Sequence, residues 1–156
     1  IRMSDRKLNG DPLIILLVED NPAHAELVMR ALESNRVDNQ IHHVIDGEQA
    51  LDYLHHRGDF AQPGTSPRPQ LVLLDLRLPR IDGLEVLKHI KTTEELRSIP
   101  TVVLTTSEAE RDITKAYDGY ANSYLVKPVD FDKFKSLMSD LGFYWLAWNT
   151  KAYGDR

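Results

Sequence analysis

The chain has 156 residues, enough for one domain with its own core, and 42% hydrophobic with 28% charged residues is ordinary for a globular protein. It contains no cysteine, which excludes disulfides, thiol nucleophiles and zinc–thiolate sites. The net charge of −5 argues against a nucleic-acid partner. No apolar run approaches the roughly 20 residues of a membrane span. No secretory signal is visible, so we expect a cytoplasmic protein without a membrane partner.

Short apolar runs alternate with segments of helical period along the chain. The strand-length runs are Leu13–Val18, Ile41–Ile45, Leu71–Leu74, Thr101–Leu104 and Tyr124–Val126. The helical segments begin at Pro22 and Glu48, near Leu84, and at Glu108 and Asp130, the last running to Trp148. This alternation predicts a parallel α/β sheet wound with helices on both faces. We expect an N-terminal extension over residues 1–11, one domain over 12–148 and a tail over 149–156.

Two local patterns sharpen these elements. The first helix opens with Asp20-Asn21-Pro22, a capping residue followed by the proline favoured in a first helical turn. Its expected inward face carries Ala23, Leu27, Ala31 and Leu32. Residues 57–69 hold two glycines and three prolines, which predicts a long loop before the third strand.

Charged and hydroxyl side chains stand where the predicted strands end. They are Glu19 and Asp20, Asp75, Thr105 and Lys127. The carboxyl ends of parallel strands meet at one edge of a sheet, where ligands bind. Two charges 4 Å apart repel by about 4 kcal/mol at an effective dielectric of 20, so three converging carboxylates need a counter-charge. An oxygen-seeking divalent cation together with Lys127 would supply it.

The competing explanation is that surface loops are simply rich in acids. It weakens when five such residues share one edge. Asp75 follows four apolar residues and precedes Leu76, which places it at the rim of the core. A carboxylate there is either a metal ligand or a nucleophile for an acyl or phosphoryl group. A phosphoryl acceptor needs a cation and a lysine to neutralise the transferred oxygens, and gains from a hydroxyl such as that of Thr105.

These residues resemble a known family, the receiver domains of two-component response regulators. The matching motifs are Val18-Glu19-Asp20-Asn21, Leu74-Asp75-Leu76-Arg77-Leu78-Pro79 with Asp82-Gly83, Thr105-Thr106-Ser107 and Tyr124-Leu125-Val126-Lys127-Pro128. The intervals of 30 residues from 75 to 105 and 22 from 105 to 127 also fit. The ordered set covers about residues 12–148.

The resemblance implies a flavodoxin-like (βα)5 sheet with strand order 2-1-3-4-5, and it implies the site roles. Asp75 would be the phosphoacceptor, and Lys127 would pair with the phosphoryl group. Thr105 and Tyr124 would be the switch residues. Mg²⁺ would be held by Asp20, Asp75 and the Arg77 carbonyl, with Glu19 acting through water.

The last helix carries an aromatic stripe at helical spacing. Its members are Phe131, Phe134, Met138, Leu141, Trp145 and Trp148. The stripe fits either a well-buried terminal helix or, as we prefer, a subunit interface enriched in aromatics. With this terminus and the proline-rich loop, the chain resembles the single-domain regulators of phytochrome-type histidine kinases, which implies a homodimer joined through Leu141, Trp145 and Trp148.

Three functions follow for comparison. The first is a stand-alone switch that a histidine kinase phosphorylates and that is not a turnover enzyme. Because we expect no DNA-binding domain after residue 148, its expected output is protein–protein contact or phosphoryl relay. The second is an Mg²⁺-dependent aspartyl phosphatase, but the second acid of an Asp-x-Asp motif is replaced by Arg77. The third is a non-phosphorylated flavodoxin-like module, whose phosphate ligand Glu19 and Asp20 would repel.

The six histidines form no zinc pattern, because adjacent pairs such as His42-His43 and His55-His56 do not converge. We expect surface or packing roles for them.

Overall fold

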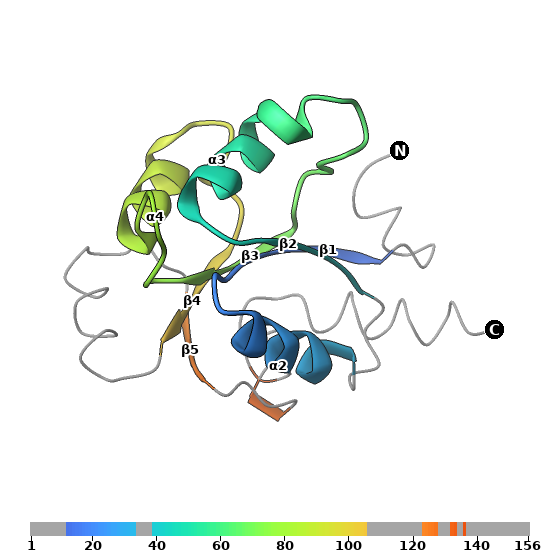
Figure 1. The fold of residues 1–156 in the computed structure, drawn as a ribbon, viewed down its shortest axis with the longest axis vertical. Coiled ribbons are helices and arrows are strands. Elements are labelled where there is room, and N and C mark those ends of the chain that lie inside the picture. The colour runs from blue at the N-terminus through green and yellow to red at the C-terminus, as the bar shows by residue number, and fades with distance from the viewer. Residues whose placement is uncertain (1–11, 34–38, 106–122, 128–131, 134–135, 137–156) are drawn as a thin grey trace.

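The computed structural model describes residues 12–33, 39–105, 123–127, 132–133 and 136, and its centre is a five-stranded parallel sheet (Figure 1). The strands are β1 (Leu13–Val18), β2 (Asn39–Val44), β3 (Leu71–Asp75), β4 (Thr101–Thr105) and β5 (Ser123–Val126). Their order is β2-β1-β3-β4-β5, and each neighbouring pair is parallel. The predicted α/β class and strand order are therefore confirmed.

Helices cover both faces of this sheet. Helix α2 (Pro22–Glu33) lies on one face, and α3 (Gly47–His55) and α4 (Gly83–Thr92) lie on the other (Figure 1). A short 3-10 helix, η1 (Gly58–Phe60), follows α3. Within the described residues, no helix is both long enough and apolar enough to span a membrane.

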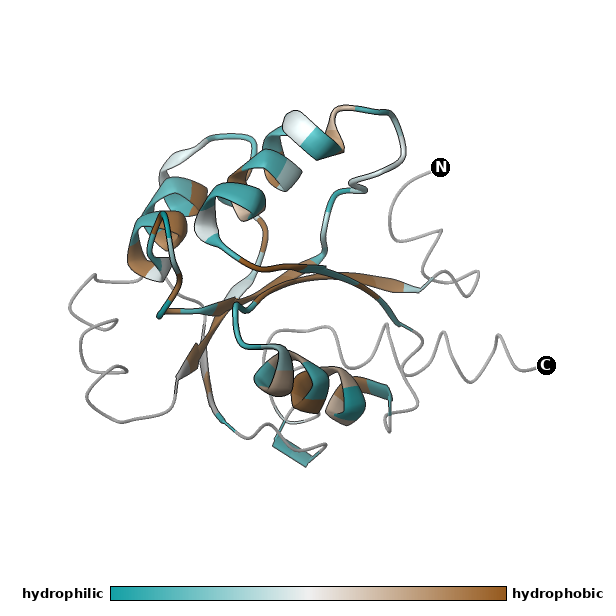
Figure 2. Ribbon diagram, in the orientation of Figure 1, coloured by the Kyte–Doolittle hydropathy of each residue, from teal (hydrophilic) through white to brown (hydrophobic). Residues whose placement is uncertain are grey.

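The core has two halves because strand side chains alternate between the faces. Leu13, Ile15 and Leu17 of β1 pack toward α2, whereas Leu16 and Val18 pack toward α3 and α4. In Figure 2 hydrophobic colouring dominates the strands of the sheet, whereas the helices mix hydrophobic and hydrophilic colours. All five residues of β3 are buried, as its continuous apolar run predicts for a central strand.

Helix α2 buries a different face from the predicted one, with Leu32 common to both. Ala25, Val28 and Leu32 are buried, whereas Leu27 is 48% exposed. The buried positions follow an i, i+3, i+7 stripe, and the helix turns this stripe toward β1 and β3 because its start is fixed by Asn21. The Asn21 side chain accepts hydrogen bonds from the backbone N–H groups of Ala23 and His24, at 2.9 and 3.1 Å. The predicted cap is thus present.

Similar caps fix the two helices on the opposite face. Asp46 accepts a hydrogen bond from the Gln49 N–H at 2.7 Å, and Asp82 accepts one from the Glu85 N–H at 3.0 Å. The predicted long loop after α3 is held by the Tyr53 hydroxyl, which donates to the Pro67 carbonyl at 2.8 Å. The helices expected over 108–117 and 130–148 lie outside the described residues, apart from three isolated positions.

Candidate functional site

Three carboxylates converge at the carboxyl edge of the sheet, as the strand exits predict. Glu19 and Asp20 follow β1, and Asp75 ends the adjacent β3. One carboxylate oxygen from each lies within 4.8 Å of the others. Glu19 is fully buried, Asp75 is 6% exposed and Asp20 is exposed. Solvent therefore reaches the cluster from the side of Asp20, and the side of Glu19 is shielded from solvent.

Lys127 reaches this cluster from the end of β5. Its Nζ lies 2.5 Å from Oε2 of Glu19 and 3.4 Å from Oδ2 of Asp75, and its side chain is only 8% exposed. Charge-assisted hydrogen bonds of this kind are short and strong. The lysine neutralises part of the acidic charge, so at least one negative charge of the cluster remains uncompensated by described side chains.

Backbone contacts fix the Glu19 side of the site. Oε1 of Glu19 accepts a hydrogen bond from the Asn21 N–H at 3.2 Å, while Oε2 accepts from Lys127. The Glu19 N–H donates to the Val44 carbonyl at 3.0 Å. The Glu19 carbonyl accepts from Nε2 of His43 at 2.8 Å, because a carbonyl cannot donate. The strand-to-helix turn is thereby tied to β2.

Asp75 combines burial with conflicting charges. Burial, the largest effect, raises the pKa of Asp75 from 3.8 to about 6; the Lys127 charge opposes the rise, and the charge and hydrogen bonding of Glu19 add to it. Its Oδ1 also accepts a hydrogen bond from the Arg77 N–H at 3.2 Å, which favours the charged form. A second cation in the cluster would favour that form further.

Gly83, the first residue of α4, packs directly against the backbone of Asp75. A Cβ at this position would lie 2.4 Å from the Asp75 carbonyl oxygen and 2.5 Å from Cα of Leu76. The Gly83 N–H donates to the Leu76 carbonyl at 3.0 Å. The start of α4 thus supports the turn that carries Asp75.

Sequence reasoning missed two histidines of the site, His43 and His24. His24, in the first turn of α2, lies with Nδ1 3.2 Å from the Lys127 Nζ and 3.8 Å from Oε1 of Glu19. Its side chain is 41% exposed. The available signal was its position four residues after Asp20, at the start of a helix that leaves the acidic edge.

Other predicted site residues are placed less fully. Thr105 ends β4 and pairs with Val126 of β5, and Tyr124 lies two register positions earlier on β5, paired with Val103. The side-chain roles predicted for Thr105 and Tyr124 lie outside what the structure describes. Arg77 is exposed beside Asp75, as expected for a residue at the mouth. The predicted interface residues Leu141, Trp145 and Trp148 lie outside the described residues.

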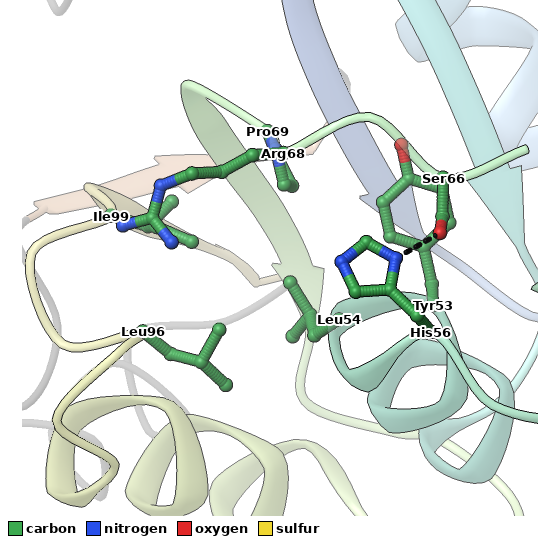
Figure 3. A pocket seen from close by; sticks show the side chains of 8 residues that line it. All are labelled: Tyr53, Leu54, His56, Ser66, Arg68, Pro69, Leu96 and Ile99. Carbon is green, nitrogen blue, oxygen red and sulfur yellow. Dashed lines mark hydrogen bonds between the residues drawn. The ribbon is translucent and has the colours of Figure 1, made fainter. Parts of the chain in front are cut away.

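A separate cavity of about 90 Å³ lies near the opposite edge of the sheet, by the start of β3 (Figure 3). Its lining side chains are Tyr53, Leu54, His56, Ser66, Arg68, Pro69, Leu96 and Ile99. The Arg68 guanidinium donates to the Glu95 carbonyl at 2.7 Å and to the Ser98 hydroxyl at 3.1 Å, and Nδ1 of His56 lies 2.7 Å from the Ser66 hydroxyl. No lining residue is acidic. The cavity is therefore distinct from the carboxylate cluster.

A central parallel sheet with buried acids and a lysine at its carboxyl edge agrees with a match to the response regulator receiver domain over residues 15–139. The chain belongs to this family. It is 51% identical over 140 residues to the probable methanogenesis regulatory protein FilR2 of Methanothrix harundinacea, covering 89% of this chain and 87% of that protein. It is 39% identical over 144 residues to response regulator Rcp1 of Synechocystis, covering 92% of this chain and 95% of that protein.

Solved structures agree with this assignment. The bacteriophytochrome response regulator RtBRR aligns with a TM-score of 0.79 and 40% identity, over 92% of this chain and 90% of that one. The phosphorylated phytochrome response regulator RcpA aligns at 0.70 and 39% identity, over 88% and 96%. The Mn²⁺-bound form of Rcp1 aligns at 0.69 and 39% identity, over 86% and 95%. The protein is thus a receiver-domain response regulator related to phytochrome response regulators.

Proposed function

We propose that this protein is a phosphorylation switch whose acceptor is Asp75. The observation that carries the proposal is a nearly buried carboxylate with Oδ2 3.4 Å from the Lys127 ammonium and two further acids beside it. The proposed donor is a phosphohistidine of a sensor kinase. The proposed output is protein–protein contact or onward phosphoryl relay.

In the proposed transfer, a carboxylate oxygen of Asp75 attacks the phosphorus of the donor phosphohistidine. An O–P bond forms, the P–N bond breaks, and the leaving imidazole nitrogen takes up a proton. The product is an acyl phosphate on Asp75. Lys127 stabilises the charge on the phosphoryl oxygens, and the hydroxyl of Thr105, with Tyr124, would respond to the new group.

The donor set fits a hard divalent cation such as Mg²⁺. All the offered ligands are carboxylate oxygens within 4.8 Å of one another, and the lysine alone does not balance their charge. Asp20 and Asp75 would bind the cation directly, together with the Arg77 carbonyl, while Glu19, whose oxygens already accept from Lys127 and Asn21, would act through water. When bound, the cation would neutralise charge on the transferring oxygens.

The experiment combines the purified protein with a small acyl phosphate and Mg²⁺, followed by intact mass. We expect one added phosphoryl group in the wild type and none in Asp75→Asn, which keeps the side-chain shape. Asp82→Asn, altered at an exposed helix cap, is the matched control and should be labelled normally. Full labelling of Asp75→Asn would refute the assignment.

We propose that the protein is a switch and not a turnover phosphatase. Arg77 stands where an aspartyl phosphatase of the Asp-x-Asp type has its second acid, and an arginine cannot act as that acid–base group. Phosphate release with excess acyl phosphate should therefore stay slow after the first equivalent. Rapid release over many equivalents would favour the phosphatase instead.

The kinase is proposed to be of the phytochrome type and the protein to work beside it in the cytoplasm. The support is the similarity to RcpA and RtBRR, which are named as a phytochrome and a bacteriophytochrome response regulator. Phosphotransfer from a panel of phosphorylated histidine kinases tests this. Preferential transfer from a phytochrome-type kinase is expected, and an equal or better transfer from unrelated kinases would contradict it.

We also propose a homodimer joined through the last helix. The support is the aromatic stripe of the sequence, which includes Leu141, Trp145 and Trp148. Light scattering should report a dimer that Leu141→Ala and Trp145→Ala weaken, whereas Lys88→Ala on the exposed side of α4 should not. A wild-type monomer at high micromolar concentration would contradict the proposal.

A further inference from the structure

We infer that His24 is a positioning residue for Lys127 and thereby sets the rate at which Asp75 gains a phosphoryl group. The inference rests on the proposed function of Asp75. It concerns a residue outside the acidic cluster, on the first turn of α2 at the mouth of the site.

The hydrogen-bond roles between the two side chains are fixed by chemistry. A lysine ammonium has three donors and no acceptor, so Nδ1 of His24, 3.2 Å from Nζ, is the acceptor. This contact requires the imidazole tautomer that carries its proton on Nε2. Lys127 then donates to two acceptors, Oε2 of Glu19 and Nδ1 of His24, and forms an ion pair with Oδ2 of Asp75.

These three contacts are unequal. Glu19 lies at 2.5 Å and His24 at 3.2 Å, whereas Asp75 lies at 3.4 Å. Two hydrogen bonds on the β1–α2 side therefore hold the ammonium, and its third hydrogen remains for the side of Asp75, with which the lysine forms an ion pair. A phosphoryl oxygen added at Asp75 can take that third hydrogen while the two hydrogen bonds stay in place. Without His24, one hydrogen bond remains and the ammonium can rotate away from the reacting carboxylate.

The backbone at His24 is held in place by the helix cap and by packing against the sheet. Its backbone N–H is bonded at 3.1 Å to the Asn21 side chain that caps α2, and the next residue, Ala25, is buried against β1. The ring is thus carried by an ordered helix start. Its 41% exposure places it at the mouth, where a docking kinase would also meet it.

The test compares three substitutions in the full chain. In His24→Asn, Oδ1 occupies nearly the place of Nδ1 and keeps an acceptor for Lys127. His24→Gln carries its oxygen one bond further out, and His24→Leu has similar bulk with no acceptor. We expect the phosphorylation rate with acyl phosphate and Mg²⁺ to fall about tenfold in His24→Leu and His24→Gln, the loss of one hydrogen bond to a charged group. His24→Asn should retain most of the wild-type rate.

A second readout separates this inference from the proposed function. The NMR signal of the Lys127 ammonium, recorded without phosphodonor, should move in His24→Leu and His24→Gln and stay near its wild-type position in His24→Asn. Thermal unfolding should show all variants folded. If the wild type takes no phosphoryl group but the lysine signal follows this pattern, the proposed function fails and the positioning contact stands. An unmoved signal with an unchanged rate in His24→Leu, or an equal loss in all three variants, would overturn the inference.

Discussion

The ammonium of Lys127 lies nearer to Glu19 than to Asp75, at 2.5 Å from Oε2 of the one and 3.4 Å from Oδ2 of the other. Glu19 is fully buried, so its charge depends on this lysine and on the Asn21 N–H. Lys127 therefore has a structural role beneath the site in addition to its proposed role at the phosphoryl group.

Lys127→Met should destabilise the cation-free protein. Removing one partner of a buried ion pair leaves an uncompensated charge, which typically costs about 3–5 kcal/mol in the free energy of unfolding. Urea denaturation with a chelator present measures the loss, and added Mg²⁺ should restore part of it. Lys88→Met, at an exposed lysine of α4, is the matched control. Equal stability of the two variants would show that Glu19 does not depend on Lys127.

The cation-free protein should lose stability as the pH rises through the pKa of Asp75. The pKa of Asp75 is raised mainly by burial from 3.8 to about 6, so the folded state holds this proton more tightly than the unfolded state. Such a group gives its full stabilisation below pH 4 and loses it as the pH passes about 6. The shift corresponds to at most about 3 kcal/mol.

Asp75→Asn isolates this contribution because it cannot ionise. Between pH 4 and 7, with a chelator present, the stability of the wild type should fall relative to that of the variant. The two should be closest at the acid end. Parallel stability curves over this range would mean that Asp75 ionises normally in the folded protein.

Cation binding should show the complementary dependence. A proton and a divalent cation compete for the Asp75 carboxylate, so the association constant for Mg²⁺ should fall by about tenfold per pH unit below about 6 and level off above it. Calorimetric titration with Mg²⁺ or Mn²⁺ from pH 5 to 8 measures this. An affinity that does not change between pH 5 and 6 would place the cation away from Asp75.

The convergence of Glu19, Asp20, Asp75 and Lys127 was predictable because it follows from topology alone. Once Leu13–Val18 and Leu71–Leu74 are assigned as parallel strands, the residues after them must share an edge. The bounds of β1 are those predicted, whereas the other strands differ from expectation by one or two residues at an end, as for β2, which begins at Asn39 and not at Ile41.

The rotation of α2 and the contacts of its histidine were not predictable in this way. Both depend on the exact phase of a helix against the sheet, which a spacing of apolar residues such as Leu27 and Leu32 leaves ambiguous. Likewise, Nε2 of His55 on α3 lies 2.8 Å from Nε2 of His89 on α4, a pairing 34 residues apart that no local pattern contains. The expected packing role of these histidines is consistent with it.

Gly83→Ala gives the sharpest test of how α4 supports Asp75. In an exposed helix, replacing glycine by alanine favours folding by about 1 kcal/mol. Here the new Cβ would lie 2.4 Å from the Asp75 carbonyl oxygen and 2.5 Å from Cα of Leu76, and backbone atoms cannot move aside as a side chain can. We therefore expect the opposite sign, a loss of about 3 kcal/mol in the free energy of unfolding.

The same displacement should reach the site, so Mg²⁺ affinity should fall in the fraction of Gly83→Ala that remains folded. Gly64→Asn is the control, because an added Cβ there meets nothing within 4 Å and its φ of +85° is one that asparagine tolerates better than most residues. Denaturation and calorimetric titration of both variants make the comparison. A stabilised Gly83→Ala with normal Mg²⁺ affinity would show that helix propensity outweighs the contact, and that α4 can shift without moving Asp75.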